Sequence, residues 1–380
     1  MKRYNTIILG AGASALMFAT HQRHHNMLMI DTNLSVGAKI KISGGGRCNV
    51  TNRSVSSSNF VSSSSRSIEP ILERFTQLDL LEFLNSNGVY PKIRTDGQYF
   101  CTKSSEEIIN MFKKLTSHVD LSLGTKILEV EKIDGEFVVT TTGGKFGAKR
   151  VVVATGGLSY TKIGASDIGL QIAAKFGHTI VVTKPALVGL TLQPPQFWFK
   201  ELSGISMRVA LKVKEKSFEG DLLFAHKGIT GPVVLNGSLY WERGEIVLDF
   251  LPKLNIVKML KGSKKQLSTL LPVSKRFAKE FLKSIDLDDK SANRLSSSEI
   301  ERLKLIHNYS FAPSGTFGYT KAETTKGGVS LDELDLDSMQ SLFVDGLYFI
   351  GEVTDVAGEL GGYNLQWAFS SAYLCAKSMA

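Results

Sequence analysis

A glycine-rich hexapeptide, Gly10–Ala15, follows an apolar stretch near the start of the chain. Gly10 allows a tight turn, and Gly12 lets the backbone approach a pyrophosphate closely. Ala15 replaces the third glycine of this pattern, and the amides of the helix that follows would face the phosphates. Asp31 ends the next apolar stretch, 21 residues after Gly10, where a carboxylate accepts ribose hydroxyls. In this strand, helix, strand context the motif predicts a dinucleotide-binding site.

A second glycine cluster lies at Ser43–Asn52, in the run SGGGRCNVTN. Three successive glycines before an arginine form a backbone segment that can lie close against a flat or anionic ligand. The guanidinium of Arg47 can bind a phosphate or the anionic edge of a flavin. The spacing alone is equally compatible with a flexible surface loop that carries a solvated arginine.

Two later segments could contact the same ligand. Arg150–Ala154 predicts a buried strand that ends in Thr155-Gly156-Gly157, where the backbone would pass near a dinucleotide or simply enter a turn. A further strand ends in Gly351-Glu352, which would place a carboxylate near a ribityl chain. Gly361–Leu365 opens the last predicted helix, whose amides would stabilise the charge on the pyrimidine of a reduced flavin. The alternative for this last segment is a helix cap with a packing glycine pair.

The residues between these motifs predict the elements that position them. Residues 54–67 contain nine serines and no apolar period, so we expect a loop there. Periodicity and turn residues predict strands at 5–9, 28–31, 126–132, 136–142, 150–154 and 346–351, and helices at 68–87, 104–118, 167–176 and 364–379.

The motifs lie near both ends of the chain, which predicts a nucleotide-binding domain interrupted by an insertion from Lys184 to about Leu336. Short alternating segments over 186–251 predict an antiparallel sheet or small barrel, and residues 255–306 have helical character. The sequence contains no second GxGxxG after a strand, so a dedicated NAD(P) domain is not expected. If NAD(P)H reduces a flavin here, it binds transiently at the flavin face.

The 380 residues carry a net charge of +9, and 43% are apolar. No apolar run reaches the length of a membrane span, and the fixed glycine spacing of the first apolar stretch argues against a secretory signal, so a cytoplasmic protein is expected. The three cysteines, Cys48, Cys101 and Cys375, are far apart and include no CxxC pair. They argue against a disulfide framework, a metal site and a redox-active dithiol beside the flavin.

Most of the excess charge lies in one segment. Residues 253–304 contain 13 Lys or Arg and 6 Asp or Glu, a net charge of +7. Such a cluster suits contact with phosphates, which makes structured RNA a candidate partner, although solvated helix faces are at least as common a reason for a basic run. The oligomeric state is not indicated by the sequence.

The chain resembles the BaiN-like flavoproteins, which are also described as NAD(P)/FAD-dependent oxidoreductases or aminoacetone-oxidase-like proteins. The resemblance covers nearly the whole chain in consistent order, and SGGGRCN and GGYNLQWA are its most specific motifs. It rests on the runs GAGASA, IKISGGGRCNVTN, VVVATGGLSYTKIGASDIG, GDLLFAHKGITGP, TTKGGVSLDEL and GLYFIGEVTDVAGELGGYNLQWAFSSAYLCA.

The resemblance implies an α/β fold: a split Rossmann-like FAD-binding domain with an inserted antiparallel β-barrel domain and a helical lid. The expected bounds are 1–183 and 337–380 for the FAD-binding domain, 184–252 and 307–336 for the barrel, and 253–306 for the basic lid. It also implies non-covalent FAD. The residues expected to contact it are Gly10, Gly12, Ala13, Ser14, Asp31, Lys39, Gly45, Gly46, Arg47, Cys48, Ile127, Ala154, Thr155, Gly156, Gly351, Glu352, Gly362, Tyr363, Asn364 and Leu365.

Three activities are associated with such proteins: reduction of a conjugated C=C bond in a steroid-like acid, oxidation of a small amine with O₂, and reduction of uridine to dihydrouridine in ribosomal RNA. The basic segment favours uridine reduction over a peroxide-forming amine oxidase. A non-catalytic, flavin-binding RNA-associated protein is a further alternative. Reduction of a C=C bond needs a proton donor, for which His226 and Cys48 are the candidates. His226 could instead brace a turn, and Cys48 could be a small packed residue.

Overall fold

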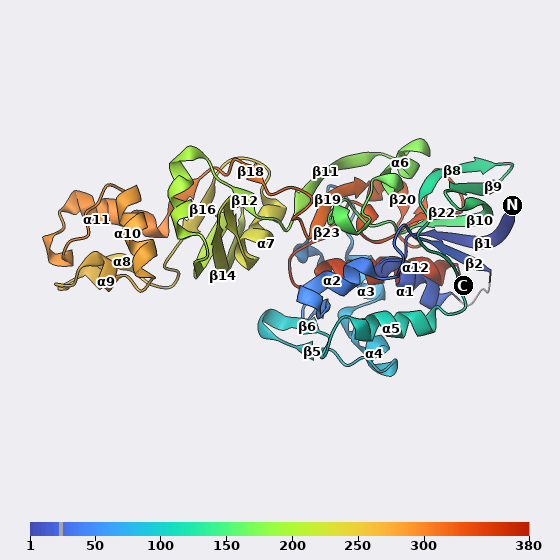
Figure 1. Cartoon of the computed structure of the whole chain (residues 1–380), viewed down its shortest axis with the longest axis horizontal. Coiled ribbons are helices and arrows are strands. Elements are labelled where there is room, and N and C mark those ends of the chain that lie inside the picture. Colours follow the sequence, from blue (N-terminus) through green and yellow to red (C-terminus); the bar gives the residue numbers. More distant parts are fainter. Residues whose placement is uncertain (23–25, 380) are drawn as a thin grey trace. The chain divides into compact units, whose positions relative to one another are not determined.

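The computed structural model describes residues 1–22 and 26–379, which divide into two compact units (Figure 1). The first unit comprises Met1–Pro185 and the chain from Glu323 onward, and the second comprises Ala186–Ala322. Each unit has its own apolar core. Residues 323–336, which the sequence led us to expect in the barrel, belong to the first unit. The reason is that β19 (Thr324–Val329) forms a two-stranded sheet with β11 (Ile180–Ala186).

A parallel sheet with the order β7-β2-β1-β10-β22 forms the centre of the first unit. Numbered along the chain this is the order 3-2-1-4-5 of a Rossmann-like sheet. All of these strands except the edge strand β7 end in a run of buried residues, as a parallel sheet between two layers requires. The strands are β1 (Lys2–Leu9), β2 (Met27–Ile30), β7 (Asp120–Ser122), β10 (Gly144–Val153) and β22 (Leu347–Phe349).

Helices cover one face of this sheet (Figure 1). The helix α1 (Ala13–His21) connects β1 to β2, and it packs against both α5 (Glu106–Leu115) and α12 (Tyr363–Ser378). The other side carries the hairpin of β8 (Ile127–Ile133) and β9 (Glu136–Thr141), against which α6 (Ile168–Lys175) packs. Asp134 and Gly135 both have positive φ, as the predicted hairpin turn requires.

The structure contains two helices where the sequence predicted one. Instead of a single helix over 68–87, α3 (Glu69–Arg74) ends before Phe75, and α4 (Gln77–Ser86) begins after Thr76. The hydroxyl of Thr76 accepts a hydrogen bond from the amide of Asp79 at 3.2 Å, and the Asp79 carboxylate accepts one from the Thr76 amide at 2.8 Å. This reciprocal cap begins a new helix, which apolar periodicity alone does not reveal.

Small strands and one further helix complete the first unit. Two of the strand groups, β3-β6-β5 and β4-β23, connect segments that are far apart in the sequence. The remaining elements are α2 (Ala38–Gly46), β3 (Asn49–Asn52), β4 (Phe60–Val61), β5 (Lys92–Ile93), β6 (Gln98–Phe100), β20 (Leu334–Asp335), β21 (Gln340–Ser341) and β23 (Ala357–Gly358).

The second unit contains a seven-stranded antiparallel sheet with the order β17-β16-β13-β14-β15-β12-β18. The helix α7 (Pro232–Tyr240) packs on β13 and β14. The strands are β12 (Leu190–Thr191), β13 (Ser206–Val213), β14 (Lys216–Ala225), β15 (Gly228–Thr230), β16 (Ile246–Asp249), β17 (Tyr309–Phe311) and β18 (Gly315–Thr316).

Four short helices gather at one end of the second unit (Figure 1). They replace the continuous helical character expected over 255–306, because Gly262 and Pro272 interrupt the chain. The apolar side of α10 contributes Phe277 and Phe281 to the core of this unit. The helices are α8 (Ile256–Leu260), α9 (Leu267–Leu270), α10 (Lys275–Ser284) and α11 (Ser297–Leu303). Within residues 1–22 and 26–379, no helix is long and apolar enough to cross a membrane.

Candidate dinucleotide-binding site

The turn between β1 and α1 requires glycine at its first position. Gly10 has a φ of 107°, and a Cβ placed on it would lie 2.4 Å from the carbonyl oxygen of Ala154. Its amide donates to the carbonyl of Ile30 at 2.7 Å. The turn is therefore held against the ends of β2 and β10, where a parallel sheet of this order binds its ligands.

Gly12 is the N-cap of α1 and lies beside open space. A Cβ on Gly12 would meet nothing within 4 Å, in contrast to one on Gly10. The first amides of a helix have no partner within the helix, so those of Ala13 and Ser14 provide donors for an anion here. Ala15 is fully buried, consistent with close packing of the helix on the sheet. The room beside Gly12 and these donors fit a pyrophosphate.

The carboxylate of Asp31 already accepts hydrogen bonds from other residues of the protein. Its carboxylate accepts hydrogen bonds from the amides of Ala11 and Asn33, both at 2.7 Å. The side-chain amide of Asn33 donates a third at 2.9 Å. Asp31 thus braces the glycine turn from the end of β2, and its contact with a ribose remains a prediction.

The second glycine cluster is a helix end rather than a simple loop. The helix α2 ends in Gly44, Gly45 and Gly46, all with positive φ. A Cβ on Gly44 would lie 2.8 Å from the amide nitrogen of Asn49, whereas one on Gly45 would meet nothing within 4 Å. Arg47 is exposed, and its guanidinium has no hydrogen bond or ion pair with the rest of the described chain. This turn therefore presents an open backbone face and an available cation.

A polar cluster connects four segments of the first unit. The ammonium of Lys39 lies 2.5 Å from the carboxylate of Glu352 and 2.6 Å from the hydroxyl of Ser159. The other oxygen of Glu352 accepts from the amide of Thr325 at 2.9 Å and from Ser159 at 3.0 Å. Lys39 and Glu352 were expected to contact FAD, but the contributions of Ser159 and Thr325 were missed. No motif marks these two residues, because Ser159 reaches Glu352 and Thr325 only through contacts between distant segments of the chain.

The last helix is anchored to the second glycine segment. A Cβ on Gly362 would lie 2.6 Å from the backbone of Thr51, so only glycine fits. The hydroxyl of Thr51 donates to the side chain of Gln366 at 2.6 Å, and the side chain of Asn52 donates to the carbonyl of Gly361 at 3.1 Å. The start of α12 therefore lies beside β3, although more than 300 residues separate them.

Three residues expected to contact FAD at the start of α12 have side chains that are bonded to or packed against the protein itself. The side chain of Asn364 accepts from the amide of Gly358 and donates to its carbonyl, both at 2.9 Å. Tyr363 is mostly buried, and burial with the nearby Glu359 raises its pKa to about 12. Leu365 is half-buried. These side chains fix the backbone of the helix start, whose amides are the expected flavin contacts.

The remaining expected contacts differ in how open they are. Gly156 has open space where a Cβ would stand, but the Thr155 hydroxyl faces α6, 2.1 Å from the place of a Cβ on Gly169. Gly351 approaches α1 closely, because a Cβ on Gly351 would lie 2.7 Å from the Ser14 hydroxyl. Ile127 is half-buried against the core of the first unit.

The two catalytic candidates differ in exposure. Cys48 is fully buried, and its thiol is hydrogen-bonded to that of Cys101, which raises the pKa of Cys48 well above its usual range. His226 lies exposed in the turn between β14 and β15, in the second unit, and its ring has no hydrogen bond with other described residues. The suggestion that hydrogen bonds of His226 brace this turn is therefore not supported. Within the described residues, no group of three or more His, Cys, Asp or Glu could hold a metal ion.

The strand order, the glycine turn and the open start of α1 define a Rossmann-like dinucleotide-binding protein. The chain matches the family model described as HI0933-like protein Rossmann domain over residues 4–378. It belongs to this family, which confirms the resemblance to the BaiN-like flavoproteins inferred from the motifs.

Three curated relatives align over almost their whole lengths. A protein of Escherichia coli (strain K12) named ribosomal RNA dihydrouridine synthase is 36% identical, over 100% of this chain and 98% of that protein. A Haemophilus influenzae protein of the same name is 35% identical over 100% of both. A 3-dehydro-bile acid delta(4,6)-reductase of Clostridium scindens is 27% identical over 98% of both.

Among solved structures, a chain of Escherichia coli quinol fumarate reductase superposes with a TM-score of 0.50. It is 15% identical and covers 100% of this chain and 70% of that chain. At this identity the likeness concerns the fold alone, and it agrees with the Rossmann-like α/β architecture expected from the sequence.

Proposed function

We propose that this protein is an FAD-dependent oxidoreductase that reduces uridine to dihydrouridine in ribosomal RNA. The observation that carries the proposal is the match, over the full chain, to two proteins named ribosomal RNA dihydrouridine synthase. The third relative is also named a reductase, which favours reduction over the oxidation of a small amine.

FAD fits the open positions of the first unit. Gly12, Gly45 and Gly156 each have free space where a side chain would stand, so an extended dinucleotide can pass close to the backbone there. The amides at the start of α1 would hold the pyrophosphate of FAD, and Arg47 would bind the anionic edge of its flavin. When bound, FAD would supply the two electrons as a hydride equivalent. NAD(P)H is the proposed reductant, bound transiently at the flavin face.

The protein must also supply a proton. The C5=C6 bond of uridine is conjugated with the C4 carbonyl, so hydride added at C6 leaves negative charge that a proton at C5 must neutralise. We propose His226 as the donor, because its ring is exposed and has no hydrogen bond with other described residues. The buried thiol of Cys48 is the second candidate, but the neighbouring Cys101 and burial raise its pKa well above the usual range, which makes it a weaker acid.

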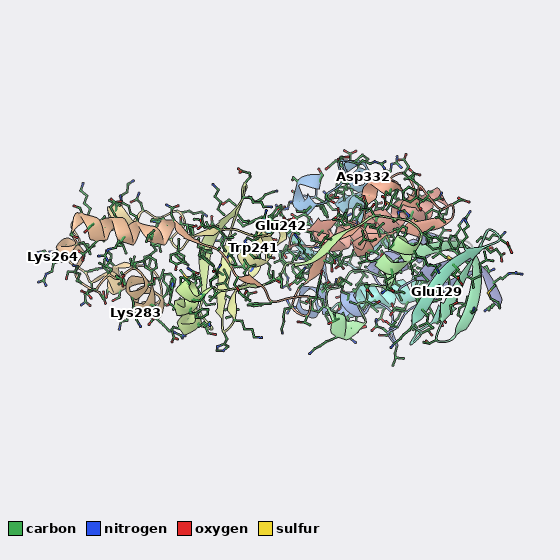
Figure 2. The ribbon with its side chains drawn as sticks, turned by 90° about the horizontal axis from the view of Figure 1, so that it is seen from above. Glu129, Trp241, Glu242, Lys264, Lys283 and Asp332 are labelled. Atoms are coloured by element: carbon green, nitrogen blue, oxygen red, sulfur yellow. The ribbon has the colours of Figure 1, made fainter. Side chains whose placement is uncertain are left out.

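Residues 253–304, the helical part of the second unit, are the proposed surface for RNA. We propose that this part acts as a lid over the bound substrate. Five of its cations are engaged with other groups of the protein: Lys253, Arg276, Lys290, Arg302 and Lys304. Eight others are exposed and make no ion pair within the described residues: Lys258, Lys261, Lys264, Lys265, Lys275, Lys279, Lys283 and Arg294. Figure 2 shows two of them, Lys264 and Lys283, on this helical part. These eight are the proposed phosphate contacts.

The proposal is tested in the host by deleting the gene and measuring nucleosides of ribosomal RNA by mass spectrometry. We expect a dihydrouridine to disappear and to return when the wild-type gene, but not a Gly12→Val variant, is restored. Purified protein with FAD and NADPH should then form dihydrouridine in RNA from the deletion strain. Unchanged RNA in that strain, together with peroxide formed from a small amine, would establish the oxidase instead.

A further inference from the structure

Two of the three cysteines lie side by side, contrary to the expectation from their spacing in the sequence. Cys48 directly precedes β3 and Cys101 directly follows β6, and these strands pair with Asn49 opposite Phe100. The amide of Cys101 donates to the carbonyl of Cys48 at 3.3 Å, so the two residues are joined through their backbones. Their spacing in the sequence argued against a redox-active dithiol beside the flavin, but strand pairing brings together these two residues, which are 53 positions apart.

The position of the pair suits a disulfide. Cys48 and Cys101 are the residues next to the Asn49–Phe100 pair, and their backbones are joined by a hydrogen bond. Facing residues of an antiparallel pair have Cα atoms about 4.5–5.5 Å apart, and disulfides span Cα separations of about 4.4–6.8 Å, so a bond between neighbours of this kind needs no movement of a whole element. Cys375 lies elsewhere, buried in α12, and burial alone raises the pKa of its thiol.

The two thiols are electrostatically different. Cys101 accepts the hydrogen bond from Cys48, which lowers the pKa of Cys101, and the amide of Ile108 in the first turn of α5 acts in the same direction. Burial and the carboxylate of Glu107 oppose this effect. The same hydrogen bond, together with burial, raises the pKa of Cys48. One member of the pair is thus suited to attack as a thiolate and the other to follow as the resolving thiol.

We propose that Cys48 and Cys101 form a redox-active dithiol that a hydroperoxide converts into an intramolecular disulfide. The thiolate of Cys101 attacks the peroxide, whose O–O bond breaks to leave water or an alcohol and a sulfenic acid on Cys101. The sulfur of Cys48 then displaces the sulfenic oxygen, which leaves with the Cys48 proton as water. The two thiols lose two electrons, and the peroxide gains them. A small dithiol such as dithiothreitol reverses the reaction by exchange.

The disulfide would act on the glycine turn that precedes it. Cys48 has a φ of 48°, a conformation that a side-chain-bearing residue rarely adopts, and it directly follows Arg47. A covalent bond to Cys101 would fix this end of the turn to β6. The chemistry of the pair does not depend on the proposed reduction of uridine.

The experiment exposes the purified protein to hydrogen peroxide, removes the peroxide, denatures the protein, alkylates free thiols and maps the peptides by mass spectrometry. We expect loss of both thiols of the pair, a peptide in which Cys48 is linked to Cys101, and an alkylated Cys375. Dithiothreitol should restore both thiols. The Cys375→Ser variant should form the same cross-link, whereas the Cys101→Ser variant should retain an alkylatable Cys48.

Three outcomes would overturn the proposal. The first is that both thiols of the pair remain alkylatable after peroxide treatment. The second is that Cys101 oxidises to a sulfinic acid without any cross-link. The third is that Cys375 is lost as fast as the pair, which would show unfolding rather than a specific reaction. Circular dichroism of each variant establishes that it is folded before the comparison is made.

Discussion

The two units offer contrasting ways to hold a polyanion. In the first unit the proposed contacts come from backbone: Gly10 and Gly362 leave no room for a methyl group, and a Cβ on Gly12 would meet no protein atom within 4 Å. In the second unit eight exposed cations lie on short helices and loops, with no such steric constraint. Binding at a site lined by backbone should be lost when a side-chain atom is added there. Binding to a surface of exposed cations should instead weaken gradually with each cation removed.

Replacing Gly12 by valine should have the largest effect on cofactor binding. Its side chain would meet no protein atom, so the apoprotein should keep its melting temperature, but it would fill the space proposed for the pyrophosphate. Flavin absorbance of the purified variant should be absent. As a control, Gly10→Ala places a Cβ 2.4 Å from the Ala154 carbonyl and should lower the free energy of unfolding by about 3 kcal/mol or more. Full flavin occupancy in Gly12→Val would show that the turn is misassigned.

Charge reversal should weaken RNA binding without loss of flavin. Arg276 is unsuitable because it donates to the carbonyls of Glu201 and Ser203, so its replacement would disturb the fold. The better set to replace by glutamate is Lys264, Lys265, Lys279 and Lys283. The slope of log affinity against log salt should become shallower by about 3–4, since each phosphate contact contributes about 0.7–0.9.

A matched control carries the same change of charge on the first unit, at Lys92, Lys114, Lys145 and Lys149, which are also exposed. RNA affinity should fall less in this control than in the variant of the second unit. Equal losses in the two variants, measured by filter binding over a range of salt concentrations, would show that net charge rather than this surface governs binding.

Asp31→Ala should have a smaller effect than Gly12→Val. It removes hydrogen bonds to the amides of Ala11 and Asn33 but adds no atom to the ligand space. It also removes the carboxylate proposed to accept the ribose hydroxyls, so we expect FAD affinity to fall by about 1–3 kcal/mol, the usual contribution of hydrogen bonds to a charged group. Fluorescence titration of the apoprotein with FAD measures this loss. An affinity equal to that of the wild type would remove Asp31 from the site.

The smallest expected effect is acid sensitivity of α11 in the second unit. The ammonium of Lys290 and the amide of Ser296 lower the pKa of Glu299 to about 2 from an ordinary value of 4.5. Because the folded pKa is the lower one, the stabilisation is complete above about pH 4.5 and is lost as the pH falls toward 2. Glu299→Gln should therefore flatten the dependence of the melting temperature on pH in this window. Parallel curves for the two proteins would contradict this role.

Local signals account for what the sequence could predict. The spacing of Gly10, Gly12 and Asp31 indicated a dinucleotide turn because strand, turn and helix are consecutive, and the structure places these residues at one sheet edge. The break at Thr76 was missed because a reciprocal cap interrupts an apolar period that continues on both sides. The cluster of Lys39 and Glu352 with Ser159 was not predictable, since it depends on contacts between distant segments.

The boundary of the insertion and the pairing of Cys48 with Cys101 were missed for the same reason. The boundary of the insertion depends on the pairing of β19 with β11, and the proximity of the two cysteines depends on the pairing of β3 with β6. Neither strand pairing has a signature in its own residues. Long-range pairing of short strands is thus the part of this fold that single-sequence reasoning fails to reach.

The anchoring of α12 to β3 has a consequence for synthesis on the ribosome. Thr51 and Asn52 are translated before the second unit, whereas their partners Gln366 and Gly361 are translated after it. The second unit is one continuous stretch, so it can fold while the first unit still lacks its final helix. We therefore expect nascent chains arrested before residue 361 to contain a protease-resistant second unit and to bind no cofactor. The order of folding would be the reverse of the order in which the two units begin to be made.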